Sequence, residues 1–164
     1  MVRLQKKKYM DKKIKVCFAA STGGHYEELI RLKPLMERYD SFILTEKTDY
    51  NAEINNCKTY YVKQINRKER LFIPRFIENI FLTLNIMRKE KPDVVISTGV
   101  LATIPVCILA KLFRKKLIFI ETFAMVTNTT QSGKLLYRFS DRFYVQWSEM
   151  LKMYPNAIYK GGLY

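Results

Sequence analysis

A glycine turn that ends in the only histidine of the chain is the part of the sequence best suited to chemistry. Residues 21–25 read Ser-Thr-Gly-Gly-His and follow a nearly all-apolar run. Two adjacent glycines let the backbone approach a bulky anion, and the free N–H groups at the start of a following helix favour negative charge. His25, at the mouth of this turn, is suited to act as a general base or to bind phosphate.

The same turn has a simpler interpretation. It lacks the third glycine of a dinucleotide-binding fingerprint and the Gly-Lys-Ser/Thr ending of a Walker A loop. A tight strand-to-helix turn without a ligand, with a capping or solvent-facing His25, is therefore the alternative that the sequence leaves open.

Three later loops carry polar residues where predicted strands end. They are Ser97-Thr98-Gly99, Glu121-Thr122-Phe123-Ala124 and Gln146-Trp147-Ser148-Glu149. Because the carboxyl ends of parallel strands share one edge of a sheet, we expect these loops to lie near the glycine turn. Glu121 ends an otherwise apolar run. It is either a second candidate base or a carboxylate that caps a helix or pairs with a nearby Lys or Arg.

The elements that must position these residues alternate between strand and helix. Short apolar runs predict strands at 14–20, 41–45, 59–62, 94–97, 117–120 and 142–145. Helical spacing and the positions of proline predict helices at 25–38, 74–91, 105–113 and 132–139. This alternation predicts an α/β fold with a doubly wound parallel sheet of about six strands. We expect one domain at residues 14–164 and a basic N-terminal arm at residues 1–13.

The formal net charge of +14 favours polyanionic partners. Nucleic acid, an anionic membrane leaflet and phosphorylated substrates all satisfy this charge. No RNA- or DNA-binding motif accompanies it, so we expect no nucleic-acid partner.

The cysteines and carboxylates show no metal-ligand spacing. Cys17 and Cys107 lie inside apolar runs, and Cys57 is far from both in the sequence. We expect reduced, structural thiols in a cytoplasmic protein, and no bound metal.

Contact with a membrane is predicted from the side of the molecule. No uncharged stretch approaches the ~18 residues of a spanning helix. The predicted helix at 74–91, with the residues just before it, is apolar over a wide arc and also on the opposite side, and basic residues lead into it. We predict that Phe72, Phe76, Leu82 and Ile86 contact an anionic membrane surface. The alternative is a helix sandwiched between the sheet and another protein.

Several motifs in series resemble those of a known family. They are the segments 20–25, 97–99, 119–124, 132–137, 145–147 and 154–162. In this order they resemble the membrane-associated subunit of the two-part UDP-N-acetylglucosamine transferase that performs the second step of dolichol-linked glycan assembly. They also resemble its bacterial capsule and exopolysaccharide counterparts, the PssD-like proteins. The resemblance covers nearly the whole chain, from about residue 15 onward.

The resemblance implies a GT-B glycosyltransferase divided between two chains. This chain would be the Rossmann-like N-terminal half, which binds a polyprenyl-diphosphate-linked sugar at the cytoplasmic face of the membrane. A small partner subunit would bind the UDP-sugar, which is a co-substrate, so no cofactor is expected. Eukaryotic members carry an N-terminal transmembrane helix, whereas this chain offers only a basic arm. We therefore expect peripheral attachment without a transmembrane helix.

The resemblance also implies roles for individual residues. His25, with Glu121 as the second candidate, would take the proton of the attacking sugar hydroxyl. The acceptor diphosphate would be held by Thr22, Gly23, Gly24, Ser97, Thr98 and Gly99, because the turn is similar to the glycine loop of the lipid II synthase. The partner subunit would contact Trp147, Tyr159, Gly161 and Gly162. The alternative function is a non-catalytic scaffold that recruits and activates the donor-binding subunit at the membrane.

Overall fold

The computed structural model describes residues 13–47, 57–66 and 69–164. They form a seven-stranded sheet in the order β3-β2-β1-β4-β5-β6-β7, and every neighbouring pair of strands is parallel. The strands are β1 (Lys15–Ala20), β2 (Asp40–Glu46), β3 (Lys58–Val62), β4 (Val94–Gly99), β5 (Lys116–Ile120), β6 (Arg142–Val145) and β7 (Ile158–Tyr159). The α-helices are α1 (Gly24–Ile30), α2 (Lys33–Arg38), α3 (Phe72–Glu90), α4 (Ile104–Leu112) and α5 (Gln131–Tyr137). Two 3₁₀ helices, η2 (Leu101–Thr103) and η3 (Ser148–Lys152), complete the elements of the described residues.

The predicted doubly wound parallel sheet is confirmed, with one strand more than expected. The additional strand, β7, is two residues long and pairs with β6 at the edge of the sheet. So short a run carries no apolar signal of its own. The predicted basic arm at residues 1–13 lies outside the described residues except for Lys13.

The helix predicted at 25–38 is two helices, which is a correction. α1 ends at Ile30, and α2 begins at Lys33 with Pro34 in its first turn. Proline has no N–H and its ring clashes with the carbonyl four residues earlier, so a continuous helix could not pass through Pro34. Pro74 likewise lies in the first turn of its helix, α3, which begins two residues before it.

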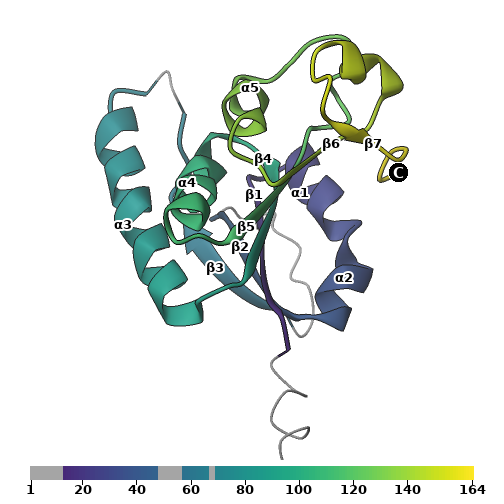
Figure 1. The fold of residues 1–164 in the computed structure, drawn as a ribbon. Coiled ribbons are helices and arrows are strands. Elements are labelled where there is room, and N and C mark those ends of the chain that lie inside the picture. The colour runs from purple at the N-terminus through teal and green to yellow at the C-terminus, as the bar shows by residue number, and fades with distance from the viewer. Residues whose placement is uncertain (1–12, 48–56, 67–68) are drawn as a thin grey trace, which may run out of the picture.

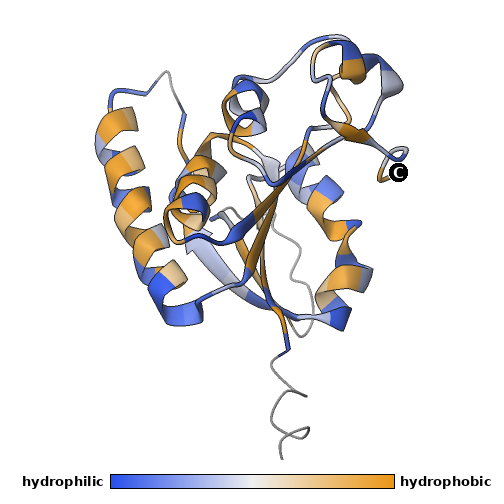
Figure 2. Cartoon of the chain, viewed as in Figure 1, coloured by the Kyte–Doolittle hydropathy of each residue, from blue (hydrophilic) through white to orange (hydrophobic). Residues whose placement is uncertain are grey.

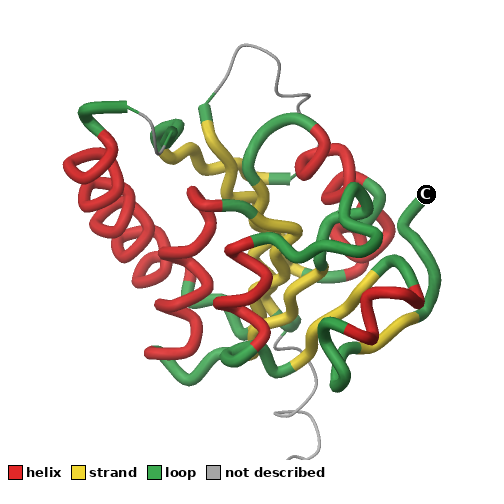
Figure 3. Tube along the Cα trace, turned by 90° about the horizontal axis from the view of Figure 1, so that it is seen from above, coloured by secondary structure: helices red, strands yellow, loops and turns green. Residues whose placement is uncertain are grey.

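Helices cover both faces of the sheet. Figures 1 and 3 show α3 and α4 on one side of the strands and α1 and α2 on the other. Side chains of β1 alternate between the two layers: Val16, Phe18 and Ala20 pack toward α1 and α2, whereas Cys17 and Ala19 pack toward α3 and α4. Burial of each large apolar side chain contributes about 1.5–3 kcal/mol. Figure 2 shows the central strands and much of α3 and α4 coloured as hydrophobic.

The predicted structural thiols are consistent with this packing. Cys17 and Cys107 are free and fully buried, whereas Cys57 is half-buried. Burial raises the pKa of the Cys107 thiol to about 12 and that of the Cys17 thiol well above its usual range. Both side chains therefore serve as small apolar packing groups.

The strand order places a topological switch point between β1 and β4. The chain proceeds from β1 toward β3 on one side and from β4 toward β7 on the other. At the carboxyl ends of these two central strands, the Ser21 amide donates to the Gly99 carbonyl at 2.9 Å. Loops that diverge at such a point leave a crevice, where ligands of this fold class bind.

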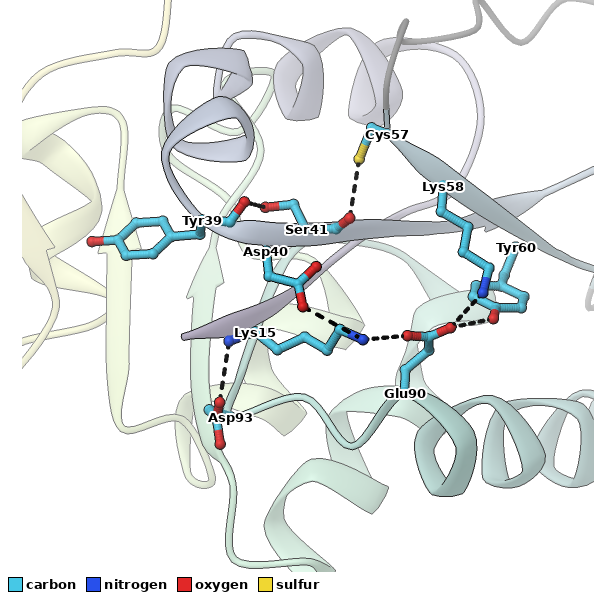
Figure 4. Close-up of polar contacts among 9 residues, drawn as sticks. All are labelled: Lys15, Tyr39, Asp40, Ser41, Cys57, Lys58, Tyr60, Glu90 and Asp93. Atoms are coloured by element: carbon cyan, nitrogen blue, oxygen red, sulfur yellow. Dashed lines mark hydrogen bonds and ion pairs between the residues drawn. The ribbon is translucent and has the colours of Figure 1, made fainter. Parts of the chain in front are cut away.

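At the opposite edge of the sheet, the carboxylate of Glu90 at the end of α3 connects three neighbouring side chains (Figure 4). Its oxygens accept hydrogen bonds from the ammonium groups of Lys15 at 2.6 Å and Lys58 at 2.7 Å, and from the Tyr60 hydroxyl. Burial alone would raise the pKa of Glu90, but these three donors together lower it to about 2. The cluster joins the start of β1 and β3 to α3.

A close approach fixes α5 against the end of β5. Thr130 caps α5 by accepting a hydrogen bond from the Gly133 amide at 2.8 Å, and its hydroxyl lies 2.9 Å from the Glu121 carboxylate. A Cβ atom on Gly133 would lie 1.9 Å from Glu121 Oε2 and 2.7 Å from the Tyr154 hydroxyl. Only glycine fits at this position.

Replacement of Glu90 tests the cluster that this residue forms with Lys15, Lys58 and Tyr60. We expect Glu90→Gln to lower the free energy of unfolding by about 2 kcal/mol at pH 7, because it removes the charge that three donors share. Since the folded-state pKa lies near 2, below the ordinary 4.5, this contribution is present above about pH 4.5 and is lost as pH falls toward 2. Urea titrations of both proteins between pH 7 and pH 3 measure it. Glu37→Gln is the control, because Glu37 is 68% exposed and lies 3.9 Å from Lys33; a difference between the variants that did not shrink in acid would contradict this account.

Replacement of Gly133 tests the close approach of α5 to Glu121 at the end of β5. Gly133→Ala forces a methyl group into the Glu121 carboxylate, and we expect it to lower the free energy of unfolding by about 2–3 kcal/mol. Gly24→Ala is the matched control, because a Cβ atom there meets nothing within 4 Å. We expect the control to change stability by less than about 1 kcal/mol, since alanine is the better helix former. Equal melting temperatures of the two variants would show that the junction tolerates a side chain.

Candidate functional site

The glycine turn lies open at the carboxyl edge of the sheet. Gly23 has φ of 68°, a conformation that favours glycine, and Gly24 begins α1. Both glycines are exposed, and a Cβ atom on either would meet nothing within 4 Å. The first amides of a helix have no carbonyl one turn earlier to pair with. The turn therefore presents accessible backbone where a polar ligand can approach.

His25 is held in a defined orientation beside this turn. Its Nδ1 lies 2.8 Å from the Thr98 carbonyl oxygen, and the Thr98 hydroxyl donates to the His25 carbonyl at 2.8 Å. A carbonyl oxygen only accepts, so Nδ1 carries a hydrogen and, in the neutral ring, Nε2 keeps the lone pair. The ring passes over Gly99, where a Cβ atom would lie 3.5 Å from Nδ1. This half-exposed imidazole is therefore oriented to accept a proton through Nε2.

Ser97 and Thr98 do not present their hydroxyl groups to the crevice. Both are buried; Ser97 Oγ donates to Thr103 Oγ1 at 3.1 Å and accepts from the Gly99 amide at 3.1 Å. The Thr98 hydroxyl is used by His25. In this structure these hydroxyls shape the loop after β4, and diphosphate binding at Ser97 and Thr98 stays a prediction.

Three of the six predicted diphosphate ligands remain reachable, and these are Thr22, Gly23 and Gly24. The Thr22 amide lies 3.4 Å from the Glu46 carboxylate, which also accepts from the Ile65 amide at 3.1 Å. Sequence reasoning missed Glu46, because it ends a strand whose following loop has no clear pattern. It anchors the turn to β2.

Glu121 is enclosed. The residue is 2% exposed, and its carboxylate accepts from the hydroxyls of Thr130 and Tyr154, each at 2.9 Å, and from the Thr122 amide at 3.2 Å. Burial, followed by the adjacent Glu121 charge, raises the pKa of the Tyr154 hydroxyl well above its usual range. The geometry therefore favours the structural alternative for Glu121, although as a partner of hydroxyl groups and not of Lys or Arg.

A second buried carboxylate was missed by the sequence reasoning. Glu28 of α1 is 3% exposed and accepts from the Thr122 hydroxyl at 2.6 Å and from the Gln146 side-chain amide at 2.9 Å. The sequence contains one sign of this role: Glu28 lies on the same side of a short helix as the apolar residues Tyr26 and Leu29. An acidic residue at a buried position needs hydrogen-bond partners. Glu28 joins α1 to the loops after β5 and β6.

The residues predicted to contact a partner gather on the β6–β7 side. Trp147 Nε1 donates to the Phe123 carbonyl at 2.7 Å, and the two rings lie 4.6 Å apart. A Cβ atom on Gly162 would lie 3.1 Å from the Phe123 ring, and Tyr159 is exposed on the edge strand. Gly161 and Gly162 also line an apolar hollow of about 300 Å³ between α2, the sheet and residues 160–163. Contact with a partner at these residues remains a prediction.

The apolar side of α3 that faces outward differs from the one predicted. Phe72, Phe76 and Ile86 pack against the core, and Leu82 is half-buried. The exposed apolar residues are Leu71 at 56%, Ile73 at 66%, Ile77 at 48% and Phe81 at 61%. In Figure 2 hydrophobic residues alternate with hydrophilic ones along α3, and most of the helix is coloured as hydrophobic. The predicted contact residues are thus partly buried, and three of them pack against the core. Their helix is apolar on two sides, and the sequence does not reveal which side meets the sheet.

The part of the chain that the structure describes contains neither a candidate metal site nor a candidate membrane-spanning helix. No group of three or more His, Cys, Asp or Glu side chains there could hold a metal ion. No helix among these residues is long and apolar enough to cross a bilayer.

Comparison with known sequences identifies relatives over nearly the whole chain. Human UDP-N-acetylglucosamine transferase subunit ALG14 is 25% identical over 177 residues, which cover 90% of this chain and 82% of the human protein. The Candida albicans subunit is 25% identical, covering 96% and 82%. A Pelagibacter ubique pyrophosphoryl-undecaprenol N-acetylglucosamine transferase is 29% identical over 92% of this chain, but over only 41% of the longer bacterial enzyme.

Solved structures share the fold. Acinetobacter baumannii MurG superposes with a TM-score of 0.68 at 16% identity, over 83% of this chain and 42% of that one. A Rickettsia bellii UDP-N-acetylglucosamine 2-epimerase superposes with a TM-score of 0.69 at 16% identity, over 92% and 45%. The chain therefore spans less than half of each of these solved chains.

The sequence model of one family covers residues 16–163, from β1 to the segment after β7. Its description is oligosaccharide biosynthesis protein Alg14 like. The matched region contains the glycine turn, His25 and the loops after β4, β5 and β6. This chain belongs to the Alg14-like family of oligosaccharide biosynthesis proteins.

Proposed function

We propose that this chain is the acceptor-binding subunit of a two-subunit GT-B glycosyltransferase, in which a small separate partner binds the UDP-sugar. The observation that carries the proposal is the match to the Alg14-like family over residues 16–163. The relatives that the chain covers nearly end to end are named as transferase subunits, and the bacterial and structural relatives are more than twice as long.

The proposed acceptor is a polyprenyl-diphosphate-linked sugar. The Pelagibacter relative is named for a pyrophosphoryl-undecaprenol substrate, which supports this class of acceptor. Within this chain, the exposed backbone at Gly23 and Gly24 and the Thr22 side chain are the groups of the original six that a diphosphate can reach. Backbone amides and a hydroxyl are suitable donors to phosphate oxygens.

The proposed chemistry is direct displacement of UDP by an acceptor hydroxyl. His25 Nε2 accepts the hydroxyl proton while the oxygen bonds to the anomeric carbon, and the bond from that carbon to the UDP oxygen breaks. The Thr98 carbonyl accepts the Nδ1 hydrogen bond at 2.8 Å and so stabilises the ring as it becomes positive. Glu121, the second candidate base, fits this role less well because its oxygens are occupied by internal donors.

A peripheral position at the cytoplasmic face of a membrane fits the outer side of α3. Ile73 and Ile77 lie in the N-terminal half of α3, Phe81 lies at its middle, and Leu71 directly precedes it. The N-terminal end of α3 lies toward the same end of the molecule as the start of α1 (Figure 1). The net charge of +14 adds attraction to anionic lipid. Such an arrangement would bring the turn close to a lipid-linked diphosphate. A role in capsule or exopolysaccharide synthesis stays part of the proposal.

The second candidate function is a scaffold that recruits and activates the donor-binding subunit without contributing a catalytic group. The enclosed state of Glu121 favours it, since His25 is then the single remaining candidate base of the two. Both functions require the partner, and they differ in what the loss of the imidazole does.

Replacement of His25 in the assembled complex separates the two functions. If His25 is the general base, His25→Ala lowers kcat by roughly 100-fold or more, while the affinity for the partner is unchanged. Glu27→Ala is the control, because Glu27 is an exposed neighbour on the same helix. The rate of sugar transfer to a synthetic polyprenyl-diphosphate sugar measures the effect. Retention of near-normal turnover by His25→Ala would establish the scaffold.

Replacement of the outward residues of α3 tests membrane contact. We expect the triple variant Ile73→Ser, Ile77→Ser, Phe81→Ser to lower the partition coefficient on anionic phosphatidylglycerol vesicles by at least about tenfold, because each apolar side chain contributes of the order of 1 kcal/mol on insertion. Phe139→Ser with Met153→Ser is the control, since these residues are also exposed but lie away from α3. Vesicle co-sedimentation measures binding; equal losses in both variants would refute a specific α3 surface.

A further inference from the structure

The Glu28 carboxylate joins three segments that are far apart in the sequence. It lies on α1, one turn after His25, and is 3% exposed. Oε1 accepts from the Thr122 hydroxyl at 2.6 Å and from the Phe123 amide at 3.0 Å, and Oε2 accepts from Gln146 Nε2 at 2.9 Å. A buried carboxylate with three donors fixes the position of the helix that carries it.

Gln146 connects Glu28 to the segment 160–164 through hydrogen bonds. Its Nε2 has two acceptors, the Glu28 carboxylate and the Glu121 backbone carbonyl at 3.1 Å. Its Oε1 accepts from the Leu163 amide at 2.9 Å. Because an ionised carboxylate only accepts, the amide nitrogen must face Glu28, and the oxygen is thereby directed at Leu163. The orientation of one side-chain amide thus links α1 to Leu163.

The segment 160–164 also contacts α1 and the β5 loop through aromatic groups. The Tyr164 ring lies 5.1 Å from the Phe123 ring, and the Arg31 guanidinium at the end of α1 lies 5.0 Å from the Tyr164 ring. Gly162 also lies close to Phe123, because a Cβ atom on this glycine would lie 3.1 Å from the Phe123 ring. The segment is therefore seated on the same loop that Glu28 holds.

From these contacts we propose that Glu28 is a positioning residue, which couples the seating of residues 160–164 to the placement of α1 and of His25. Displacement of the segment removes the Leu163 donor from Gln146 Oε1, so that this amide loses one of the three hydrogen bonds that hold it beside Glu28. α1 has only seven residues, so a change at Glu28 is transmitted over one turn to His25. The consequence for sugar transfer rests on the proposed function, because this segment is where partner contact is predicted.

The single histidine of the chain allows a direct test without turnover. Glu28→Gln keeps an acceptor for Thr122 and Phe123 but places an NH₂ group against Gln146 Nε2. We expect the imidazole NMR signals of His25 to shift in the folded variant, and exchange of the Leu163 amide hydrogen to accelerate by about five- to tenfold. Glu27→Gln is the matched control, with the same change at an exposed neighbouring position. It should alter neither signal. A histidine-free affinity tag keeps the spectrum to one imidazole.

A reciprocal variant tests the coupling from the other end. Leu163→Pro removes the N–H donor without altering α1, and Leu163→Ala retains it. We expect Leu163→Pro, but not Leu163→Ala, to move the His25 signals in the same direction as Glu28→Gln. This variant also decides the matter if Glu28→Gln fails to fold.

The coupling is refuted if His25 signals are unchanged in Leu163→Pro. It is also refuted if folded Glu28→Gln leaves both Leu163 exchange and the His25 signals as in the unaltered chain. Both readouts use the complete chain without partner, donor or acceptor. Failure of the transferase proposal would therefore leave this result intact, and failure of the coupling would leave the transferase proposal intact.

Discussion

Two hydrogen bonds between His25 and Thr98 connect the start of α1 to the end of β4, each at 2.8 Å. They are possible because the strand order places β1 beside β4, although 73 residues separate the two partners in sequence. This contact sets the tautomer of the neutral imidazole and leaves the lone pair on Nε2. The open glycine turn, the buried hydroxyl groups and the proposed proton transfer all depend on it.

At the carboxyl edge of the sheet, an exposed glycine turn lies beside loops that buried carboxylates hold in place. Gly23 and Gly24 leave free space, whereas the carboxylates of Glu28, Glu46 and Glu121 are buried and accept hydrogen bonds from neighbouring loops. Buried carboxylates with several donors give rigid structure and are poor candidates for proton exchange with a substrate. This contrast leaves His25 as the better candidate base.

Much of the fold could be predicted because buried parallel strands are short apolar runs that the sequence displays directly. The edge strand β7 could not be predicted because two residues carry no pattern. The break between α1 and α2 is hidden because the apolar residues on both sides of it keep one helical spacing. The end of β4 and the loops after β5 and β6 contact α1 at one edge of the sheet, as the strand pattern predicts, but their individual contacts could not be predicted. Which way Ser97 and Thr98 point depends on the loop after β4, and the role of Glu28 depends on contacts 94 to 118 residues away. Likewise, tertiary packing decides which side of α3 faces outward, and a helical wheel does not show this packing.

The most direct test of a divided enzyme is sugar transfer by the separate and combined chains. The purified chain, its donor-binding partner and an equimolar mixture are each given a UDP-sugar and a polyprenyl-diphosphate-linked sugar, and the glycolipid product is quantified. The account predicts little or no product from either chain alone and rapid transfer by the mixture. Transfer by this chain alone at the full rate of the mixture would contradict it.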